Sequence, residues 1–437
     1  MIKFEDAKSK RRTDGKKFLF REKLGQVFRG IRKEPVPRKE RTLDYERIIM
    51  TVARLKPRYL NLGLLIAVLG ISLFGVLMVY SASWYNATIY FNNRYHFFTS
   101  QLIGLILGMV GLGFAYHVDY RVYARFRWAI LGGAIVLLLL VFVPGVGVTN
   151  LGATRWIGIG GFTMQPSEIA KFAFLIFAAS RGDPWTTVAS PGKSSPAGES
   201  DVALKHLSIR KLALVLGVGL LLCGLILLQP NLSIVMTLGM TMFICLFLFG
   251  ARIKHLAILM IPVLIAVPVM LVAEPYRIAR LVAFVDPWAT PREEGFQLIQ
   301  SLFGLGNGGL FGVGFLNSTQ KYMFLPFSES DFIFSIIGEE FGLIGTAGFL
   351  IALGYVVFKI FGVGKRCRDP FGKFLAFGIG VLIFVQSAIN IAVVTGSIPP
   401  TGLPLPFVSF GGTSLFVYLS AIGIVLNIDK RSRMLVN

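Results

Sequence analysis

The stretch from Lys211 to Gly250 reads KLALVLGVGLLLCGLILLQPNLSIVMTLGMTMFICLFLFG and decides the class of fold. Lys211 is its one charged residue, and Pro230 divides it into two apolar runs, 211–229 and 231–250. The hydrocarbon core of a bilayer is about 30 Å thick, and a helix needs roughly 20 apolar residues to cross it. Both runs are long enough, so we expect two transmembrane helices with a very short connection.

The same criterion applied outward finds ten candidate spans: 60–82, 98–116, 127–145, 166–181, 211–229, 231–250, 255–273, 331–361, 373–395 and 412–428. Segments that cross lipid must satisfy their own backbone hydrogen bonds, so we expect them to be helices. The composition agrees, because 54% of residues are hydrophobic and 15% are charged, against about 25% charged in soluble domains. We predict an all-α, polytopic integral membrane protein, which excludes most soluble enzyme folds.

The distribution of basic residues predicts the orientation in the membrane. With ten spans both termini lie on one side, and that side carries 37 of the 44 Lys and Arg residues, against 6 on the other and Lys171 within a span. Cytoplasmic loops carry the excess of Lys and Arg in membrane proteins. We therefore expect both termini to be cytoplasmic and residues 274–330 to form a large extracytoplasmic loop between helices 7 and 8.

This topology predicts a labelling pattern. A membrane-impermeant thiol reagent should reach cysteines placed in 274–330 from outside the cell, and cysteines in 183–205 only after the membrane is opened, since the basic loops stay inside. Labelling of 183–205 in intact cells would overturn the orientation.

The chain divides by composition into a basic cytoplasmic tail at 1–58, a transmembrane domain at 59–429 and a cytoplasmic C-terminal tail at 430–437. The net charge of +21 does not indicate nucleic-acid binding, because 19 Lys and Arg against 8 Asp and Glu lie in 1–58 and the rest occupy short loops. The N-terminal tail is either solvated and disordered or in contact with anionic lipid or a cytoplasmic partner. The three cysteines have no C-x-x-C spacing, and the four histidines form no zinc-hydrolase motif.

Two outer segments differ from ordinary connections: residues 146–165, and the loop 274–330, where aromatic and aliphatic residues alternate with charges. Long loops inside a domain are usually functional or disordered, and the apolar residues favour order here. The glycine-rich run 304–309 lacks the Gly-Lys-Ser/Thr of a phosphate loop, which excludes that nucleotide site.

Ionisable groups within a span are costly and usually functional. Glu168 and Lys171 stand three residues apart behind Pro166, which suits a helix start that Gln165 or Ser167 would cap. We interpret them as a functional charge pair. Further polar groups in the spans are Glu339, Glu340, Gln386 and Asn390, and for the last two the simplest interpretation is hydrogen bonding between helices. Gly104 and Gly108 indicate close helix packing.

Asp331 stands where the large outer loop meets the apolar run of the eighth span, after Ser328, Glu329 and Ser330. One interpretation is an acid in the first turn that interacts favourably with the helix dipole. The other is a carboxylate at the outer membrane boundary, where it is reachable from water and meets a substrate with a lipid tail and a polar head.

Several motifs, taken together, resemble the SEDS family (shape, elongation, division and sporulation) of peptidoglycan glycosyltransferases. They occur in the family's order over about 60–430: Arg155-Trp156-Ile157, Gln165-Pro166-Ser167-Glu168 with Lys171, Asp286-Pro287-Trp288, 297–301, Leu325-Pro326, Asp331-Phe332-Ile333-Phe334, Gly338-Glu339-Glu340, 400–407 and 409–414. The form of 400–407 and the basic N-terminal extension are more like the division member of the family than the elongation member.

The resemblance implies polymerisation of lipid II at the outer face of the bacterial cytoplasmic (inner) membrane, at the division septum, with undecaprenyl diphosphate as leaving group. It implies Asp331 as general base, and it makes the following residues candidates for substrate binding: Arg155, Trp156, Glu168, Lys171, Arg277, Arg280 and Lys321. The expected partners are a class B penicillin-binding protein and other membrane proteins of the divisome, together with membrane lipid and without nucleic acid. A divalent cation, Mg²⁺ or Mn²⁺, is the candidate cofactor, for which no complete ligand set is visible.

Two alternatives stay open. One is a transporter that flips lipid II, which also predicts buried charges and broken helices. The other is the elongation paralogue with the same chemistry. The sequence also departs from the family, because Phe327 and Glu329 replace residues of its usual Glu-x-His-Thr motif, and Asn231 stands where Asp is usual.

Overall fold

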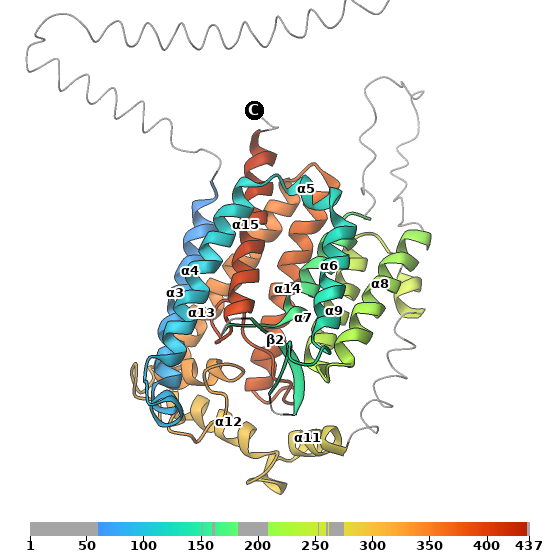
Figure 1. The fold of residues 1–437 in the computed structure, drawn as a ribbon. Helices are drawn as coiled ribbons and strands as arrows, with labels where there is room; N and C mark the ends of the chain where they lie inside the picture. Colours follow the sequence, from blue (N-terminus) through green and yellow to red (C-terminus); the bar gives the residue numbers. More distant parts are fainter. Residues whose placement is uncertain are drawn as a thin grey trace, which may run out of the picture. The chain divides into compact units, whose positions relative to one another are not determined.

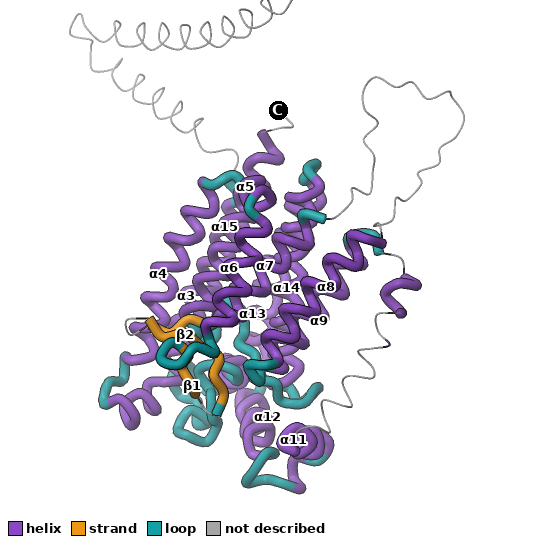
Figure 2. The backbone as a smooth tube through the Cα atoms, turned by 45° about the vertical axis from the view of Figure 1, so that its right-hand side comes forward, coloured by secondary structure: helices purple, strands orange, loops and turns teal. Residues whose placement is uncertain are grey.

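The computed structural model describes residues 60–150, 152–159, 162–181, 209–251, 253–258, 261 and 275–434. Figures 1 and 2 show that helices dominate this part of the chain. The elements are α3 (Leu62–Phe91), α4 (His96–His117), α5 (Tyr120–Arg125), α6 (Arg127–Leu140), β1 (Gly147–Asn150), β2 (Ala153–Ile159), β3 (Phe162–Met164), α7 (Pro166–Ala179), α8 (Ile209–Leu227), α9 (Leu232–Leu248), α11 (Pro275–Val285), the 3₁₀ helix η1 (Pro287–Ala289), α12 (Phe296–Gly308), α13 (Ile333–Arg366), α14 (Pro370–Val394) and α15 (Gly412–Met434).

The structure confirms a polytopic, helical membrane protein. Within the described residues, α3, α4, α8, α13, α14 and α15 are long and apolar enough to cross a bilayer, and α6 and α9 are shorter apolar helices. With α7, nine of the ten expected spans have a helix at their position, and most of the expected span 255–273 lies outside the described residues. The expected tail 1–58 lies outside them too.

Helix boundaries differ from the expected ones in both directions. Helix α3 continues to Phe91, nine residues beyond the expected end at 82, and α15 continues to Met434 into the expected C-terminal tail. Helix α7 begins at Pro166 as expected and ends at Ala179. The expected cap is wrong, because no side chain caps α7 and the Ser167 hydroxyl is buried without a hydrogen-bond partner.

The segment 146–165 holds a small antiparallel sheet, an element that the sequence analysis did not predict. Strand β2 lies between β1 and β3, and Trp156 pairs with Val148 across the first ladder. The segment contains threonine, isoleucine, valine and aromatic residues, which favour strands, and Gly152 with φ +74° lies in the first turn. The outer end of the bundle therefore carries a three-stranded sheet in place of an irregular connection.

Glycines permit the close contact between α4 and α15, which are neighbours in Figure 1. A Cβ added at Gly104 would lie 2.9 Å from the Cα of Gly412, and one at Gly108 would lie 2.5 Å from Leu419 Cδ1. At Gly104 the neighbour is backbone, so glycine is what lets the two helices approach there, whereas at Gly108 the Leu419 side chain would have to move. The interpretation of Gly104 and Gly108 as a packing motif is confirmed.

Helix α13 is broken inside the membrane domain. Gly342 has φ 64° and ψ −167°, which interrupts the helical hydrogen bonds. The carbonyl groups of Glu339 and Glu340 accept hydrogen bonds from the backbone of the segment 309–314, and two N–H groups after the break donate back to that segment. Irregular backbone at membrane depth is tolerated where protein satisfies its polar groups, and here the large outer loop does so.

The two ends of the bundle differ in character. At one end, Arg366 pairs with Asp429 at 3.0 Å and Arg431 pairs with Asp119 at 2.9 Å. Helices α11 and α12 and the small sheet lie at the opposite end in both views. Among the described residues, the basic positions around Asp119, Arg366 and Arg431, which were predicted to be cytoplasmic, thus share one end, and Asp331 lies toward the other.

Candidate functional site

Asp331 lies at the outer end of the bundle, directly before α13. The N-cap of α13 is Phe332, and no side chain makes a capping hydrogen bond there. The alternative interpretation of Asp331, an acid that interacts favourably with the helix dipole, needs no such bond and stays a prediction. Asp331 is partly exposed as a whole residue.

The backbone around Asp331 is held at three consecutive carbonyl groups. Phe410 N–H donates to the carbonyl of Glu329 at 2.9 Å, and the Ser409 hydroxyl donates to that of Ser330 at 2.5 Å. The Asn390 side-chain amide donates to the carbonyl of Asp331 itself at 2.8 Å. The segment before α13 is thus fixed to α14 and to the loop between α14 and α15.

That loop brings Gly402 against the Asp331 carboxylate. A Cβ at Gly402 would lie 3.1 Å from Asp331 Oδ2, and Gly402 has φ +69°. Glycine adopts this backbone conformation at little cost, whereas other residues are strained there. Both the conformation and the space beside the carboxylate favour glycine.

Gln386 and Asn390, one turn apart on α14, hold successive carbonyl groups of the same loop. The Gln386 amide donates to the carbonyl of Pro404 at 2.9 Å, and the Asn390 amide donates to that of Leu403 at 2.6 Å. The expected role of these residues was hydrogen bonding between helices. Their observed role is wider, because Asn390 ties the loop that carries Gly402 to the segment that carries Asp331.

The charge pair Glu168 and Lys171 is connected to Gln386, which holds the loop between α14 and α15. Lys171 Nζ lies 2.8 Å from Glu168 Oε1 and 2.6 Å from Gln386 Oε1. The Tyr418 hydroxyl donates to the same Gln386 oxygen. Lys171 is fully buried and Glu168 is 1% exposed, so hydrogen bonds and charge have to replace the water that both lost. The pair orients Gln386, which in turn holds the loop.

The surroundings of Asp331 raise its affinity for a proton. Burial raises the pKa of Asp331 to about 6, and the neighbouring Glu329 carboxylate adds to that increase, while the Ser330 hydroxyl, Arg280 and Arg155 act in the opposite direction. Burial also raises the pKa of Glu329. Asp331 is therefore ionised at neutral pH and basic enough to accept a proton, as general bases are.

Arg155 lies on β2 and joins the sheet to the turn between α8 and α9. Its guanidinium donates to the carbonyl groups of Gln229 and Pro230, and its charge acts on Asp331. Asn231, the departure from the family pattern in this turn, caps α9 by accepting a hydrogen bond from Ile234 N–H at 3.3 Å. Aspartate accepts the same bond, so the substitution preserves the cap.

Of the remaining candidates, Arg280 on α11 is 3.8 Å from Glu294 in a partly exposed ion pair and also acts on Asp331. Arg277 belongs to the same helix, and its side chain lies outside the described residues. Trp156 is half-buried on β2 beside Arg155. The structure thus brings Asp331, Glu329, Arg155 and Arg280 into one electrostatic neighbourhood.

Lys321 has a different environment. Its ammonium group is fully buried, 3.3 Å from Glu340 Oε1, and also donates to the carbonyl of Leu316. Burial lowers the pKa of Lys321, while Glu340 raises it. The adjacent Glu339 accepts hydrogen bonds from residues 318–320. In this arrangement Lys321 neutralises Glu340 and anchors the outer loop to α13.

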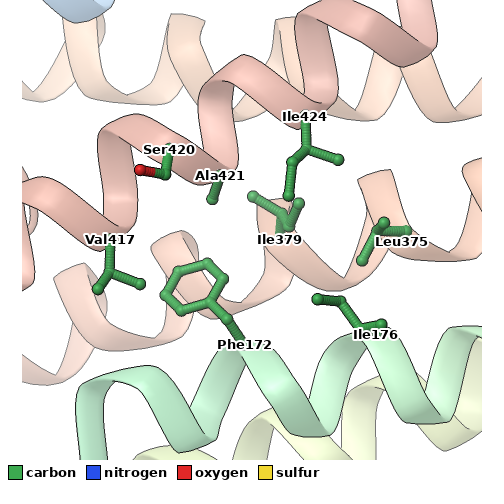
Figure 3. A pocket seen from close by; sticks show the side chains of 8 residues that line it. All are labelled: Phe172, Ile176, Leu375, Ile379, Val417, Ser420, Ala421 and Ile424. Carbon is green, nitrogen blue, oxygen red and sulfur yellow. The ribbon is translucent and has the colours of Figure 1, made fainter. Parts of the chain in front are cut away.

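Two other features lie apart from these charges. Among the described residues, no three His, Cys, Asp or Glu side chains are close enough to hold a metal ion. A cavity of about 90 Å³ lies between α7, α14 and α15 (Figure 3), lined by Phe172, Ile176, Leu375, Ile379, Val417, Ser420, Ala421 and Ile424. This lining suits hydrocarbon better than a sugar or a diphosphate.

The region of this chain that matches known proteins in sequence is the helical domain from α3 to α15. Residues 62–434 match a family described as "Cell cycle protein", whose profile is named for FtsW, RodA and SpoVE. The chain is 37% identical over 361 residues to a probable peptidoglycan glycosyltransferase FtsW of Geobacter sp. (strain M18), covering 82% of this chain and 94% of that protein. It is 35% identical over 384 residues to stage V sporulation protein E of Bacillus subtilis (strain 168), covering 88% of this chain and 100% of that protein.

Solved structures resemble the fold over nearly the same length. A chain from a peptidoglycan synthase complex, described as coordinating polymerization and crosslinking, has a TM-score of 0.67 at 26% identity, covering 86% of this chain and 99% of that one. The crystal structure of the rod shape determining protein RodA of Thermus thermophilus has a TM-score of 0.59 at 23% identity, covering 85% and 97%. The second likeness concerns the fold alone.

Proposed function

The chain belongs to the cell cycle protein family of FtsW, RodA and SpoVE, and from this we propose that it is a peptidoglycan glycosyltransferase that polymerises lipid II with Asp331 as general base. The observation that supports the assignment of the base is the position of Asp331, whose backbone carbonyl accepts a hydrogen bond from Asn390 and whose carboxylate is bordered by Gly402.

In the proposed reaction, the 4-hydroxyl of an acceptor N-acetylglucosamine attacks the anomeric carbon of a donor N-acetylmuramic acid. The hydroxyl proton moves to Asp331, the new glycosidic bond forms, and the bond to undecaprenyl diphosphate breaks with its electron pair on the leaving oxygen. A positioned base contributes typically 10²–10⁴-fold to rate. Diphosphate is a good leaving group, so a second carboxylic acid of the kind that glycosidases use is not required.

Arg155 and Arg280 are the cations proposed to neutralise the diphosphate, because fixed positive charge stabilises a developing oxyanion. Both lower the pKa of Asp331 electrostatically, which supports this role. Arg277 and Trp156 are proposed to assist substrate binding from α11 and β2. For Glu168, Lys171 and Lys321 the contacts favour positioning of the site over direct contact with substrate.

The names of the relatives support a proposed role in the cell. Several relatives carry the name FtsW, so we assign this chain to cell division, in the inner membrane at the septum. A class B penicillin-binding protein is the proposed partner, since one structural neighbour is a synthase complex that couples polymerization to crosslinking. The elongation role and a lipid II flippase remain the competing functions, and the broken helix α13 is the feature that favours a flippase.

The test is a polymerisation assay. The full chain is purified with its class B penicillin-binding protein, lipid II is supplied, and the transpeptidase is blocked with a β-lactam. Glycan polymer under these conditions supports the proposal. Lipid scrambling between vesicle leaflets without polymer would instead support the flippase.

Gly402→Ala tests the space beside the carboxylate. The matched control is Gly396→Ala, because Gly396 also has φ +69° but its added Cβ would only reach Leu298 at 3.4 Å. Both variants should lose about 1 kcal/mol of stability from the strained backbone. Only Gly402→Ala should also lower kcat, by about tenfold or more, because small misplacements of reacting groups are costly. Equal kcat values for the two variants would contradict the close approach.

Glu329→Gln tests the electrostatics through the pH profile. The acid limb of kcat/KM should lie near pH 6 in the parent, because the pKa of Asp331 is about 6 and only its ionised form is a base. Removing the Glu329 charge eliminates one cause of that raised pKa, so the limb should move to lower pH. A limb that moves to higher pH, or does not move, would show that Glu329 does not act on the catalytic carboxylate.

A further inference from the structure

Helix α11 presents its apolar side away from the protein. Ile278, Leu281, Val282 and Val285 are 41%, 38%, 50% and 77% exposed, and their spacing of i, i+3, i+4 and i+7 makes them one stripe. Ala283, on the opposite side of the helix, is 2% exposed. A water-exposed helix has the reverse arrangement, with its apolar stripe against the protein.

The charges and aromatic residues near this stripe match a membrane surface. Residues 275–285 contain Arg277 and Arg280 and no acidic residue, and Arg280 also lies 3.8 Å from Glu294. The positive charge of the helix itself suits anionic lipid phosphates. Trp288 follows in η1 and is 62% exposed, with its ring 5.9 Å from Phe303 of α12. Tryptophan is enriched at the level of lipid headgroups.

The direction of the helix agrees with this setting. In Figures 1 and 2, α11 runs across the long axes of the bundle helices, at the end of the bundle where the sheet and α12 lie. A helix in that direction lies parallel to the membrane plane. Leu302 and Phe303 of α12 are also exposed, and Phe303 contacts Trp288.

We infer that α11 is an interfacial helix, with the stripe Ile278, Leu281, Val282 and Val285 in the acyl chains of the outer leaflet and Arg280 at the level of the lipid phosphates. The inference deepens the proposed function. A lipid-linked substrate carries its diphosphate at that same level, so α11 sets the height at which a cation meets the diphosphate beside Asp331. Apolar area and attraction to anionic lipid both strengthen such binding.

Depth-dependent fluorescence quenching tests the inference without any need for activity. Single cysteines replace Val282, Val285 and, as the matched exposed control, Glu293; the native Cys223, Cys245 and Cys367 are buried. Each cysteine carries the fluorophore NBD, and the full chain alone is reconstituted in vesicles of phosphatidylethanolamine and phosphatidylglycerol. Labels at 282 and 285 should emit at shorter wavelength than the label at 293. They should also be quenched by lipids with a nitroxide near the headgroup, while aqueous iodide should quench the label at 293.

Two outcomes would overturn the inference. Labels at 282 and 285 could be as accessible to iodide as the label at 293, or they could become protected only when the penicillin-binding protein is added, which would make the stripe a protein interface.

A kinetic experiment tests the effect on the substrate. Val282→Asp with Val285→Asp should raise KM for lipid II about tenfold with kcat near the parent value, because the helix leaves its lipid site. An unchanged KM would refute the placement of the diphosphate by α11. An inactive parent protein would reject the proposed function and leave the quenching result standing.

Discussion

Asp331→Asn should abolish glycan polymerisation while the protein is expressed and binds its partner normally. Asparagine keeps the shape of the side chain, but an amide cannot accept a proton at neutral pH. If Asp331 is the base, the rate should fall by at least about 10²-fold, the lower limit of what a positioned base contributes. The measurement is polymer formed from lipid II by the purified complex.

The stability of the same variant separates this role from a helix-end role. The pKa of Asp331 is about 6 in the folded protein against an ordinary value of 3.8, so the folded state holds its proton to higher pH than the unfolded state does. Stability therefore falls as pH rises from about 4 to about 6, and the ionised carboxylate weakens the fold at neutral pH. Asp331→Asn removes that cost and should be at least as stable as the parent. A stabilising acid at the helix start predicts instead a loss of about 1 kcal/mol.

Glu329 is the internal control, because it is the other carboxylate in the same neighbourhood. Asp331→Asn, Glu329→Gln and the double variant are compared in the same assay. Near-normal polymer from Asp331→Asn, with Glu329→Gln inactive, would transfer the role of base to Glu329. Near-normal polymer from the double variant would reject both carboxylates and the mechanism with them.

The helical membrane fold could be predicted from the sequence because lipid imposes one simple requirement. A span needs about 20 apolar residues whose backbone hydrogen bonds are satisfied within the helix. Runs such as 211–229 meet this requirement by their length and composition alone. The break at Gly342 could not be predicted in this way. The backbone polar groups around the break form hydrogen bonds with residues 309–314. The hydropathy of 331–361 contains no information about a hydrogen-bond partner in another segment.

In the candidate site, too, some residues could be predicted from the sequence and others could not. Asp331 and the pair Glu168 and Lys171 stood out because charges near or within a span are costly. Gln386 and Asn390 were noticed as polar residues on one helix face, but their targets are backbone carbonyls of the following loop, and carbonyls carry no sequence signal. Gly402 was one glycine among 48 in the chain. Its nearness to the carboxylate depends on how the loop folds back.

Glu168→Ala and Lys171→Ala should each destabilise the protein severely and remove activity. Removing one partner leaves an uncompensated buried charge, which costs about 3–5 kcal/mol, and Glu168 and Lys171 are almost completely inaccessible to water. The measurement is the apparent melting temperature in detergent, followed by polymerisation. The exposed control Glu293→Ala should change stability by no more than about 0.5 kcal/mol.

The double variant Glu168→Gln with Lys171→Met separates the electrostatic penalty from the function of the pair. With both charges gone no ion remains buried without a partner, and such replacements are often neutral or stabilising, so the melting temperature should recover toward that of the parent. Activity should not recover. Gln386 would lose the Lys171 ammonium, which lies 2.6 Å from its oxygen, and would keep the Tyr418 hydroxyl as donor to that oxygen. The amide that donates to the carbonyl of Pro404 would then be held less firmly. Full activity in the stable double variant would show that the pair is a structural element with no effect on Asp331, and parental stability in both single variants would show that the pair is incidental.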